Sequence, residues 1–279
     1  MRWGLRILFV VGLLCMSAPY SKPQVREIRV AAAADLSFAM PDLARQFEKQ
    51  TRVKVSVTYG SSGNFYAQMQ NGGPFDLFFS ADIEYPRKLE AVGLAEPGTL
   101  YEYALGRIVI WAPVDSKLNL AMQGWQALLE PRVQKIAIAN PQHAPYGRAA
   151  LAALKNAGIY EQVKAKLVFG ENIAQAAQFI QSGNADAGII AMSLALSSAM
   201  RNGKCWEIPA SMHPPIEQGM ILLKSARDKD MARAFLEFVL SPTGKGILTK
   251  FGFSIPGTNS SSYRGLDRGS TPALVTTRS

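Results

Sequence analysis

Residues 27–40 read EIRVAAAADLSFAM, in which an apolar strand pattern runs directly into a helical one. Ile28, Val30 and the four alanines that follow predict a buried strand over 27–34. Apolar residues then recur at helical spacing until about residue 50, at Leu36, Met40, Leu43 and Phe47. A strand followed at once by a helix is the unit from which parallel α/β folds are built.

The same alternation of short apolar runs and helical patterns continues along the chain. Further strands are predicted at 53–59, 76–80, 107–112, 135–139, 166–168, 187–191 and 216–223. The helical patterns between and after them cover 65–71, 85–92, 147–157, 172–182 and 228–240, with a short turn from 241. This order predicts an α/β protein.

An internal echo indicates two similar lobes. Residues 70–79 (QNGGPFDLFF) and 181–190 (QSGNADAGII) both read as helix end, glycine stop, aspartate and buried strand. Extended segments near 107–113 and 209–223 would connect the lobes as hinges. We therefore expect a two-lobed clamshell of the periplasmic-binding-protein type II class, in which each lobe is a mixed, mainly parallel sheet flanked by helices. Lobe one would comprise 26–108 and 218–257, and lobe two 109–217.

The two ends of the chain differ from this body. Residues 1–22 combine Arg2 and Arg6 with a short apolar run and small residues, which is the pattern of a signal peptide. The run is too short for a transmembrane helix, and Leu14 before Cys15 disfavours a lipid anchor. We expect an exported, soluble, periplasmic protein with no membrane anchor. Residues 258–279 are rich in Ser, Thr, Gly and Arg and predict a flexible tail.

Composition excludes several classes of function. The formal charge is +9 over 279 residues, but Arg2, Arg6 and the tail at 258–279 account for a net four of these charges. Basic residues in the body are scattered without a recognition motif, so we expect no nucleic-acid partner. Two cysteines and two histidines provide no metal-ligand spacing.

Four loops follow predicted strands and precede helices, at 34–37, 60–63, 140–147 and 170–173. Ligands of parallel sheets gather at such strand ends, where helix starts present free N–H groups. Hydroxyls of Ser62 and Tyr146 would add donors. Two loops from each lobe would form a cage of neutral donors for a small tetrahedral anion, although each loop taken alone also fits an ordinary helix cap.

These loops resemble one known family, the periplasmic molybdate-binding proteins of ABC transporters (ModA). The resemblance runs from about residue 30 to 257. It is carried jointly by AAAADL at 31–36, YGSSGN at 59–64, GPFDLFFSAD at 73–82 and ANPQHAPYG at 139–147.

The resemblance implies that Asp35, Ser62, Tyr146 and Ile173 hold the oxygens of the oxyanion, with no direct bond between protein and metal and no cofactor. Many members have Ser or Asn at the position of Asp35, so here its N–H would face the ligand while its side chain caps the following helix or turns away. Ser37 could then supply the missing hydroxyl. Many members also place a ligand-binding tyrosine where this chain has Ala191, and Tyr146 would then supply the phenol.

The function implied is capture of molybdate, and of the similarly sized tungstate, for delivery to an ABC permease by a monomeric binding protein. A different oxyanion, sulfate or phosphate, is the alternative within the class, since Asp35 could accept the proton of a phosphate. A secreted hydrolase using the same cleft is the alternative of another class, because His143 lies near Tyr146 in sequence. No nucleophile motif or carboxylate pair accompanies that histidine, so we expect no enzyme.

Overall fold

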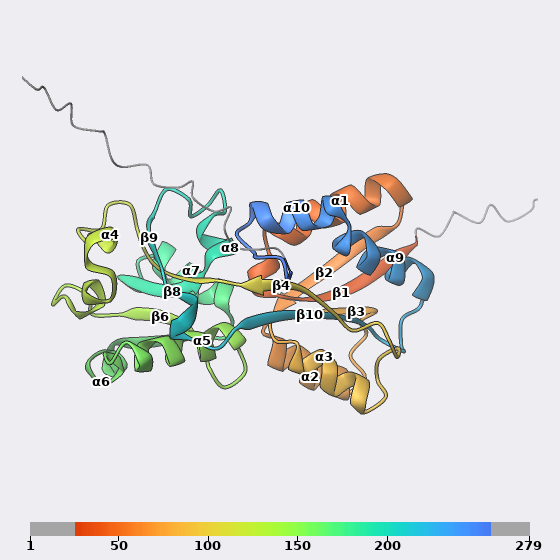
Figure 1. The fold of residues 1–279 in the computed structure, drawn as a ribbon, viewed down its shortest axis with the longest axis horizontal. Helices are drawn as coiled ribbons and strands as arrows, with labels where there is room; N and C mark the ends of the chain where they lie inside the picture. The colour runs from red at the N-terminus through yellow and green to blue at the C-terminus, as the bar shows by residue number, and fades with distance from the viewer. Residues whose placement is uncertain (1–25, 258–279) are drawn as a thin grey trace, which may run out of the picture.

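The computed structural model describes residues 26–257, so the predicted signal peptide and tail lie outside the described residues. Two sheets of five strands each form the framework. Figure 1 shows them side by side along the long axis, with β10 and the β4–β5 segment running between the two halves. The predicted two-lobed α/β fold is confirmed.

The first sheet has the strand order β2-β1-β3-β10-β4. Strands β1, β2 and β3 are parallel, and β10 is antiparallel to both β3 and β4. The bounds of its strands are β1 Glu27–Ala33, β2 Lys54–Gly60, β3 Leu77–Ser80, β4 Tyr101–Gly106 and β10 Ile216–Leu222. Its helices are the short 3-10 helix η1 Ala34–Leu36, α1 Ala39–Thr51, α2 Ser62–Gln70, α3 Glu84–Ala91, α9 Lys229–Leu240 and α10 Pro242–Lys250.

The second sheet repeats this plan in the order β7-β6-β8-β5-β9. Strands β6, β7 and β8 are parallel, and β5 is antiparallel to β8 and β9. The strands are β5 Ile108–Ala112, β6 Ile136–Ala139, β7 Leu167–Gly170, β8 Ala187–Ala191 and β9 Lys204–Glu207. The helical segments are α4 Leu120–Gln123, η2 Gly124–Leu129, α5 Pro145–Asn156, α6 Tyr160–Val163, η3 Lys164–Lys166, α7 Ile173–Gln181, α8 Met192–Ala195 and η4 Ala210–Met212.

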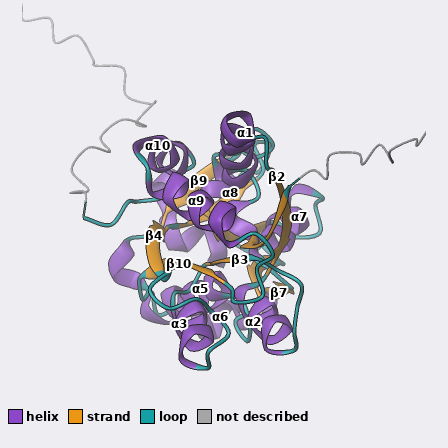
Figure 2. Ribbon diagram, turned by 90° about the vertical axis from the view of Figure 1, so that its right-hand side faces the viewer, coloured by secondary structure: helices purple, strands orange, loops and turns teal. Residues whose placement is uncertain are grey.

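Strand β1 shows why the sheet must be covered on both faces. Successive side chains of a strand point to opposite faces, and from Val30 to Ala33 the side chains on both faces are apolar. Val30 and Ala32 pack in the cluster with α1 and α9, whereas Ala31 packs with α2 and α3. Figures 1 and 2 show these helices on opposite sides of the strands.

The chain crosses between the two sheets twice. The chain leaves the first sheet at Gly106 and enters the second at Ile108, and it returns through residues 208–215 into β10. The exact lobe limits that the sequence predicts stay a prediction. Within residues 26–257, no helix is both long enough and apolar enough to cross a membrane.

Candidate oxyanion site

Four loops meet where the two sheets face each other, and they are the four that the sequence singled out. They line one small pocket between the two sheets. Its walls come from both lobes and consist of Ala33, Ala34, Asp35, Gly60, Ser61, Ser62, Ala81, Ala144, Pro145, Tyr146, Asn172 and Ile173. We call this pocket the cage.

Helix α2 brings two serines to the cage wall. Ser61 is the N-cap of α2, and its Oγ accepts from the N–H of Asn64 at 3.4 Å. Ser62 is buried, and its Oγ accepts from the N–H of Ala81 at 2.9 Å. Because that bond uses a lone pair of the Ser62 hydroxyl, the hydroxyl proton is left to be donated to a ligand.

Asp35 lies in η1 at the end of β1 and is fully buried. Its Oδ2 accepts from the hydroxyl of Tyr146 at 2.9 Å and from the amide of Gln218 at 2.7 Å. Its Oδ1 is buried without a hydrogen-bond partner. Burial raises the pKa of the Asp35 carboxyl to about 6, although the bonds from Tyr146 and Gln218 and the nearby N–H groups of Asp35 and Leu36 act in the opposite direction.

The Asp35 side chain therefore does not cap helix α1, one of the two positions expected for it. No side-chain cap bond forms at the start of that helix, which begins after a break at residues 37 and 38. The carboxyl instead turns toward lobe two. Its main-chain carbonyl does the same, because it accepts from the hydroxyl of Ser193 in α8 at 2.7 Å.

Helix α5 carries Tyr146 in its first turn, and Pro145 occupies a position where a missing N–H costs nothing. The ring is buried, and burial raises the pKa of the Tyr146 phenol well above its usual range, with the Asp35 charge adding to the effect. Two glycines make room for this arrangement. A Cβ at Gly106 would collide with the Tyr146 hydroxyl, and one at Gly147 with the backbone of Ala139.

Helix α7 completes the cage. Its N-cap residue Asn172 accepts from the N–H groups of Ala174 and Gln175 at 3.0 and 3.1 Å. The N–H of the first helical residue has no intrahelical acceptor, and here that residue is Ile173, in the cage wall.

The structure thus brings Asp35, Ser62, Tyr146 and Ile173 together, and it does not place Ser37 with them. Ser37 lines a separate, more open hollow with Tyr59 and Gln175. Its role as a ligand stays a prediction that the geometry of the cage does not support.

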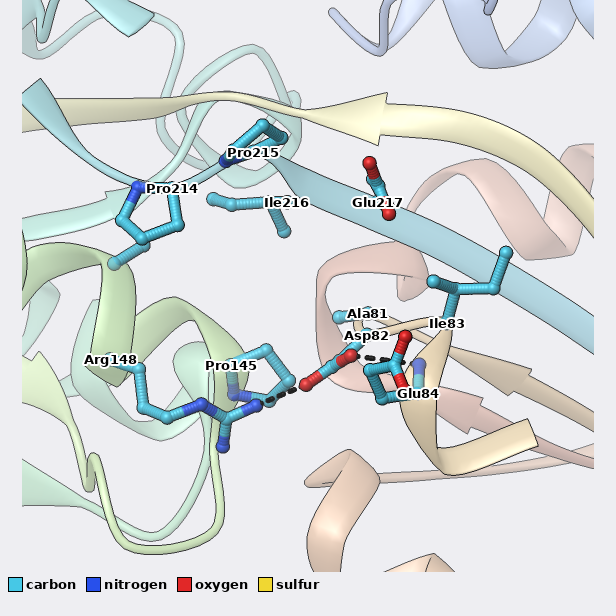
Figure 3. Close-up of a pocket in the computed structure, with 11 residues that line it drawn as sticks. Ala81, Asp82, Ile83, Glu84, Pro145, Arg148, Pro214, Pro215, Ile216 and Glu217 are labelled. Carbon is cyan, nitrogen blue, oxygen red and sulfur yellow. Dashed lines mark hydrogen bonds and ion pairs between the residues drawn. The ribbon is translucent and has the colours of Figure 1, made fainter. Parts of the chain in front are cut away.

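Contacts between the lobes surround the cage and hold it closed. The N–H of Gly63 donates to the carbonyl of His143 at 3.0 Å, and the amide of Asn64 donates to Glu171 at 3.0 Å. At the rim, Arg148 forms an ion pair with Asp82. Figure 3 shows this pair below Pro145, in an adjoining pocket bordered by Pro214, Pro215 and Glu217.

Sequence reasoning missed the partners that fix Asp35. Gln218 is buried in β10, and its amide also donates to the Tyr146 hydroxyl at 3.0 Å, while its Oε1 accepts from Tyr103 at 2.7 Å. A glutamine in a strand whose other buried residues are apolar was the available signal. His143, considered for a hydrolase, has its Nδ1 3.1 Å from Ser61 Oγ, and no carboxylate bonds to the ring within residues 26–257.

Two α/β lobes that close over a cage of hydroxyl and N–H donors define a solute-binding protein of the clamshell class. The comparisons with known proteins agree. The chain belongs to the bacterial extracellular solute-binding protein family, whose model matches residues 28–254, and within it to the ModA proteins.

Three relatives support this assignment. The chain is 36% identical to the molybdate-binding protein ModA of Azotobacter vinelandii, over 88% of this chain and 94% of the relative. It is 35% identical to ModA of Rhodobacter capsulatus, over 81% of this chain and 88% of the relative. The solved periplasmic molybdate-binding protein of Azotobacter vinelandii matches with a TM-score of 0.77 and 34% identity, covering 82% of this chain and 99% of that one. These relatives are binding proteins rather than enzymes.

Proposed function

We propose that this protein captures molybdate, and tungstate with it, in the periplasm and delivers it as a monomer to an ABC permease. The observation that carries the proposal is the closed cage, in which donors from both lobes converge on one pocket. The names of the relatives, which describe molybdate-binding proteins, point to the same ligand. The lobes that close would be 26–108 with 218–257, and 109–217.

Ser62, Tyr146 and the N–H groups of Asp35 and Ile173 would hold the oxygens of the oxyanion. A helix start presents about half a positive charge, and α2, α5 and α7 all begin at the cage. These donors are neutral groups that are buried and held in place by the fold. They can therefore point at the oxygens of the anion without a charged side chain having to move into the cage. The tetrahedral anion would touch both lobes at once and stabilise the closed form, which a permease would then recognise.

Titration calorimetry with molybdate, tungstate, sulfate and phosphate tests the ligand. We expect molybdate and tungstate to bind far more tightly than the two smaller anions. Sulfate or phosphate binding as tightly as molybdate would contradict the proposal and favour the alternative oxyanion.

A pair of serine variants tests the site. Ser62→Ala removes a hydroxyl donor to an anion, a bond worth about 1.5–3 kcal/mol, so molybdate affinity should fall by about tenfold or more. Ser37→Ala removes the same atom from the neighbouring hollow and should change affinity less than about twofold. Thermal melting of both variants checks that they fold. An equal loss of molybdate affinity in the two variants would indicate that Ser37 also contacts the ligand.

A further inference from the structure

A chain of four buried polar side chains crosses from lobe one to lobe two behind the cage. Tyr103 of β4 donates to Gln218 of β10, and Gln218 donates to Asp35. Tyr146 of α5 also donates to Asp35 and accepts a second bond from the Gln218 amide. All four side chains are buried, so water does not compete for these bonds.

The hydrogen bonds among these four side chains leave no proton on Tyr146 for a ligand. The Gln218 amide nitrogen lies within hydrogen-bond distance of both Asp35 Oδ2 and the Tyr146 hydroxyl oxygen. Tyr146 has one hydroxyl proton, and the Asp35 carboxylate takes it. While Asp35 is ionised, Tyr146 therefore has no proton to donate to an oxyanion in the cage.

The surroundings of Asp35 favour its neutral form when a dianion arrives. The partners of its carboxyl are neutral groups, and Oδ1 is buried without any partner although Asp35 lines the cage. The titratable side chains that face it are Tyr103 and Tyr146, and both phenols have pKa values raised by burial, so they stay neutral. An ionised carboxylate in the wall of the cage would repel a bound dianion and oppose its binding.

The charged and titratable groups nearest the rim are engaged elsewhere. Arg148 pairs with Asp82, and Glu171 accepts from Asn64. His143 contacts Ser61. Burial already raises the pKa of the Asp35 carboxyl to about 6. A proton from solvent can therefore reach this carboxyl at a modest cost near neutral pH.

We propose that Asp35 takes up one proton from solvent with each oxyanion that binds, so that the cage captures a dianion and a proton together. This inference rests on the proposed function. As a neutral acid, Asp35 donates its new proton to the Tyr146 hydroxyl oxygen, and Tyr146 then turns its own proton toward the ligand. Gln218 keeps both of its bonds. When the oxyanion leaves, the proton returns to solvent and Tyr146 donates to the carboxylate again.

The experiment measures protons and affinity together. Calorimetry of molybdate binding in two buffers of different ionisation enthalpy gives the number of protons taken up, between about pH 7 and about pH 9, where molybdate itself is a dianion. We expect about one proton per site and a Kd that rises about tenfold per pH unit in this range.

The Asp35→Asn variant supplies a neutral amide that can donate to the Tyr146 hydroxyl as the protonated acid would. It should bind molybdate with no proton uptake and with a Kd that no longer depends on pH. Glu102→Gln is the matched control, because Glu102 lies next to Tyr103 on β4 and is largely exposed, and because partial desolvation and the charge of Glu217 raise the pKa of its carboxyl as well. This control should keep the uptake of one proton.

Infrared difference spectra of the unaltered protein provide a measurement that needs no variant. Molybdate should produce the carbonyl stretch of a protonated carboxylic acid. Molybdate binding with neither proton uptake nor this band overturns the inference and leaves the proposed function standing. Proton uptake without the band, joined to a loss of affinity in Asp35→Asn, would place the proton on the ligand and also overturns it. Failure of every oxyanion to bind at any pH overturns both proposals.

Discussion

Replacing Gly63 by alanine should separate closure of the lobes from stability of the fold. Gly63 lies in the first turn of α2, and its N–H donates across the interface to the carbonyl of His143. A Cβ at this position would lie 2.7 Å from that carbonyl oxygen and 3.0 Å from the Cα of His143. The obstacle is backbone of the opposite lobe, which cannot move aside as a flexible side chain would.

The size of the effect follows from this contact. Overpacking a tight interface by one methyl group costs about 1–3 kcal/mol, and shifting α2 away would also weaken the bond from Gly63 to His143. The cost falls only on the closed form, where the lobes touch. Molybdate affinity should therefore fall by about 5-fold to about 150-fold. The open form should lose nothing, because alanine is the better helix former.

Calorimetry gives the affinity of Gly63→Ala, and small-angle scattering shows whether molybdate still makes the molecule more compact. Gly246→Ala is the matched control. Gly246 lies in helix α10, and a Cβ there would meet nothing within 4 Å. This control should bind molybdate normally and melt slightly higher.

Unchanged affinity in Gly63→Ala would refute the reasoning, because it would mean that the ligand-bound lobes do not approach as closely as they do here. A large drop in melting temperature of the free protein would refute it in another way. The methyl group would then disturb lobe one itself and not the contact between lobes.

Two further predictions concern ion pairs. Arg148→Met should weaken molybdate binding less than about fivefold, because the partly exposed ion pair with Asp82 is worth about 0.2–1 kcal/mol. This effect should disappear in about 1 M salt, which screens exposed charges. A larger loss of affinity that persists in salt would indicate direct contact between Arg148 and the ligand. Asp76→Asn should lower the free energy of unfolding by about 3 kcal/mol at pH 7, because Asp76 is buried against Arg29. Burial raises the pKa of Asp76, but bonds from the Arg29 side chain and from the Arg29 and Arg227 N–H groups outweigh it and lower the pKa. The contribution is therefore present above about pH 4 and lost as the pH falls through the folded-state value, so urea titrations should show the difference from the unaltered protein shrinking in acid.

The repeated plan of the two lobes could be predicted because it depends on short local sequence patterns, at 70–79 and 181–190. The aspartates of the internal echo, Asp76 and Asp186, occupy matching places before β3 and β8. Asp76 accepts from the N–H of Arg29 at 2.7 Å, and Asp186 accepts from that of Lys135 at 2.9 Å. Each carboxylate accepts from a backbone N–H of the neighbouring strand segment, within β1 at Arg29 and just before β6 at Lys135, so the echo reflects a real repeated contact and not merely a common junction.

The strands that the sequence did not reveal were β4 and β9. Both lie at the edge of their sheets, where one side lacks a partner strand. β9 is only four residues long and none of them is fully buried, so it has no apolar run to detect. β4 alternates only partly, because Tyr103 and Ala104 are both buried. Edge strands depend on the neighbour that they pair with, and a local pattern does not identify that neighbour.

The orientation of Asp35 could not be predicted for a different reason. Its helix-start position favoured a capping role, which is a local interaction. The carboxyl instead accepts hydrogen bonds from Tyr146 and Gln218, which lie 111 and 183 residues away in the chain. Only the closed arrangement of two lobes brings these donors together.

That arrangement explains how a cage for an anion can close with a carboxylate in its wall. In the structure, the Asp35 side chain and carbonyl accept from Tyr146 and Ser193, both of lobe two. The carboxylate thus occupies the Tyr146 hydroxyl, which is the donor that we propose for a bound anion, and this bond joins the two lobes. An oxyanion in the cage would have to compete with Asp35 for Tyr146, and it would do so most easily if the carboxyl changed from acceptor to donor. The same residue would then stabilise the closed form in both states, through one hydrogen bond whose direction is reversed by a single proton.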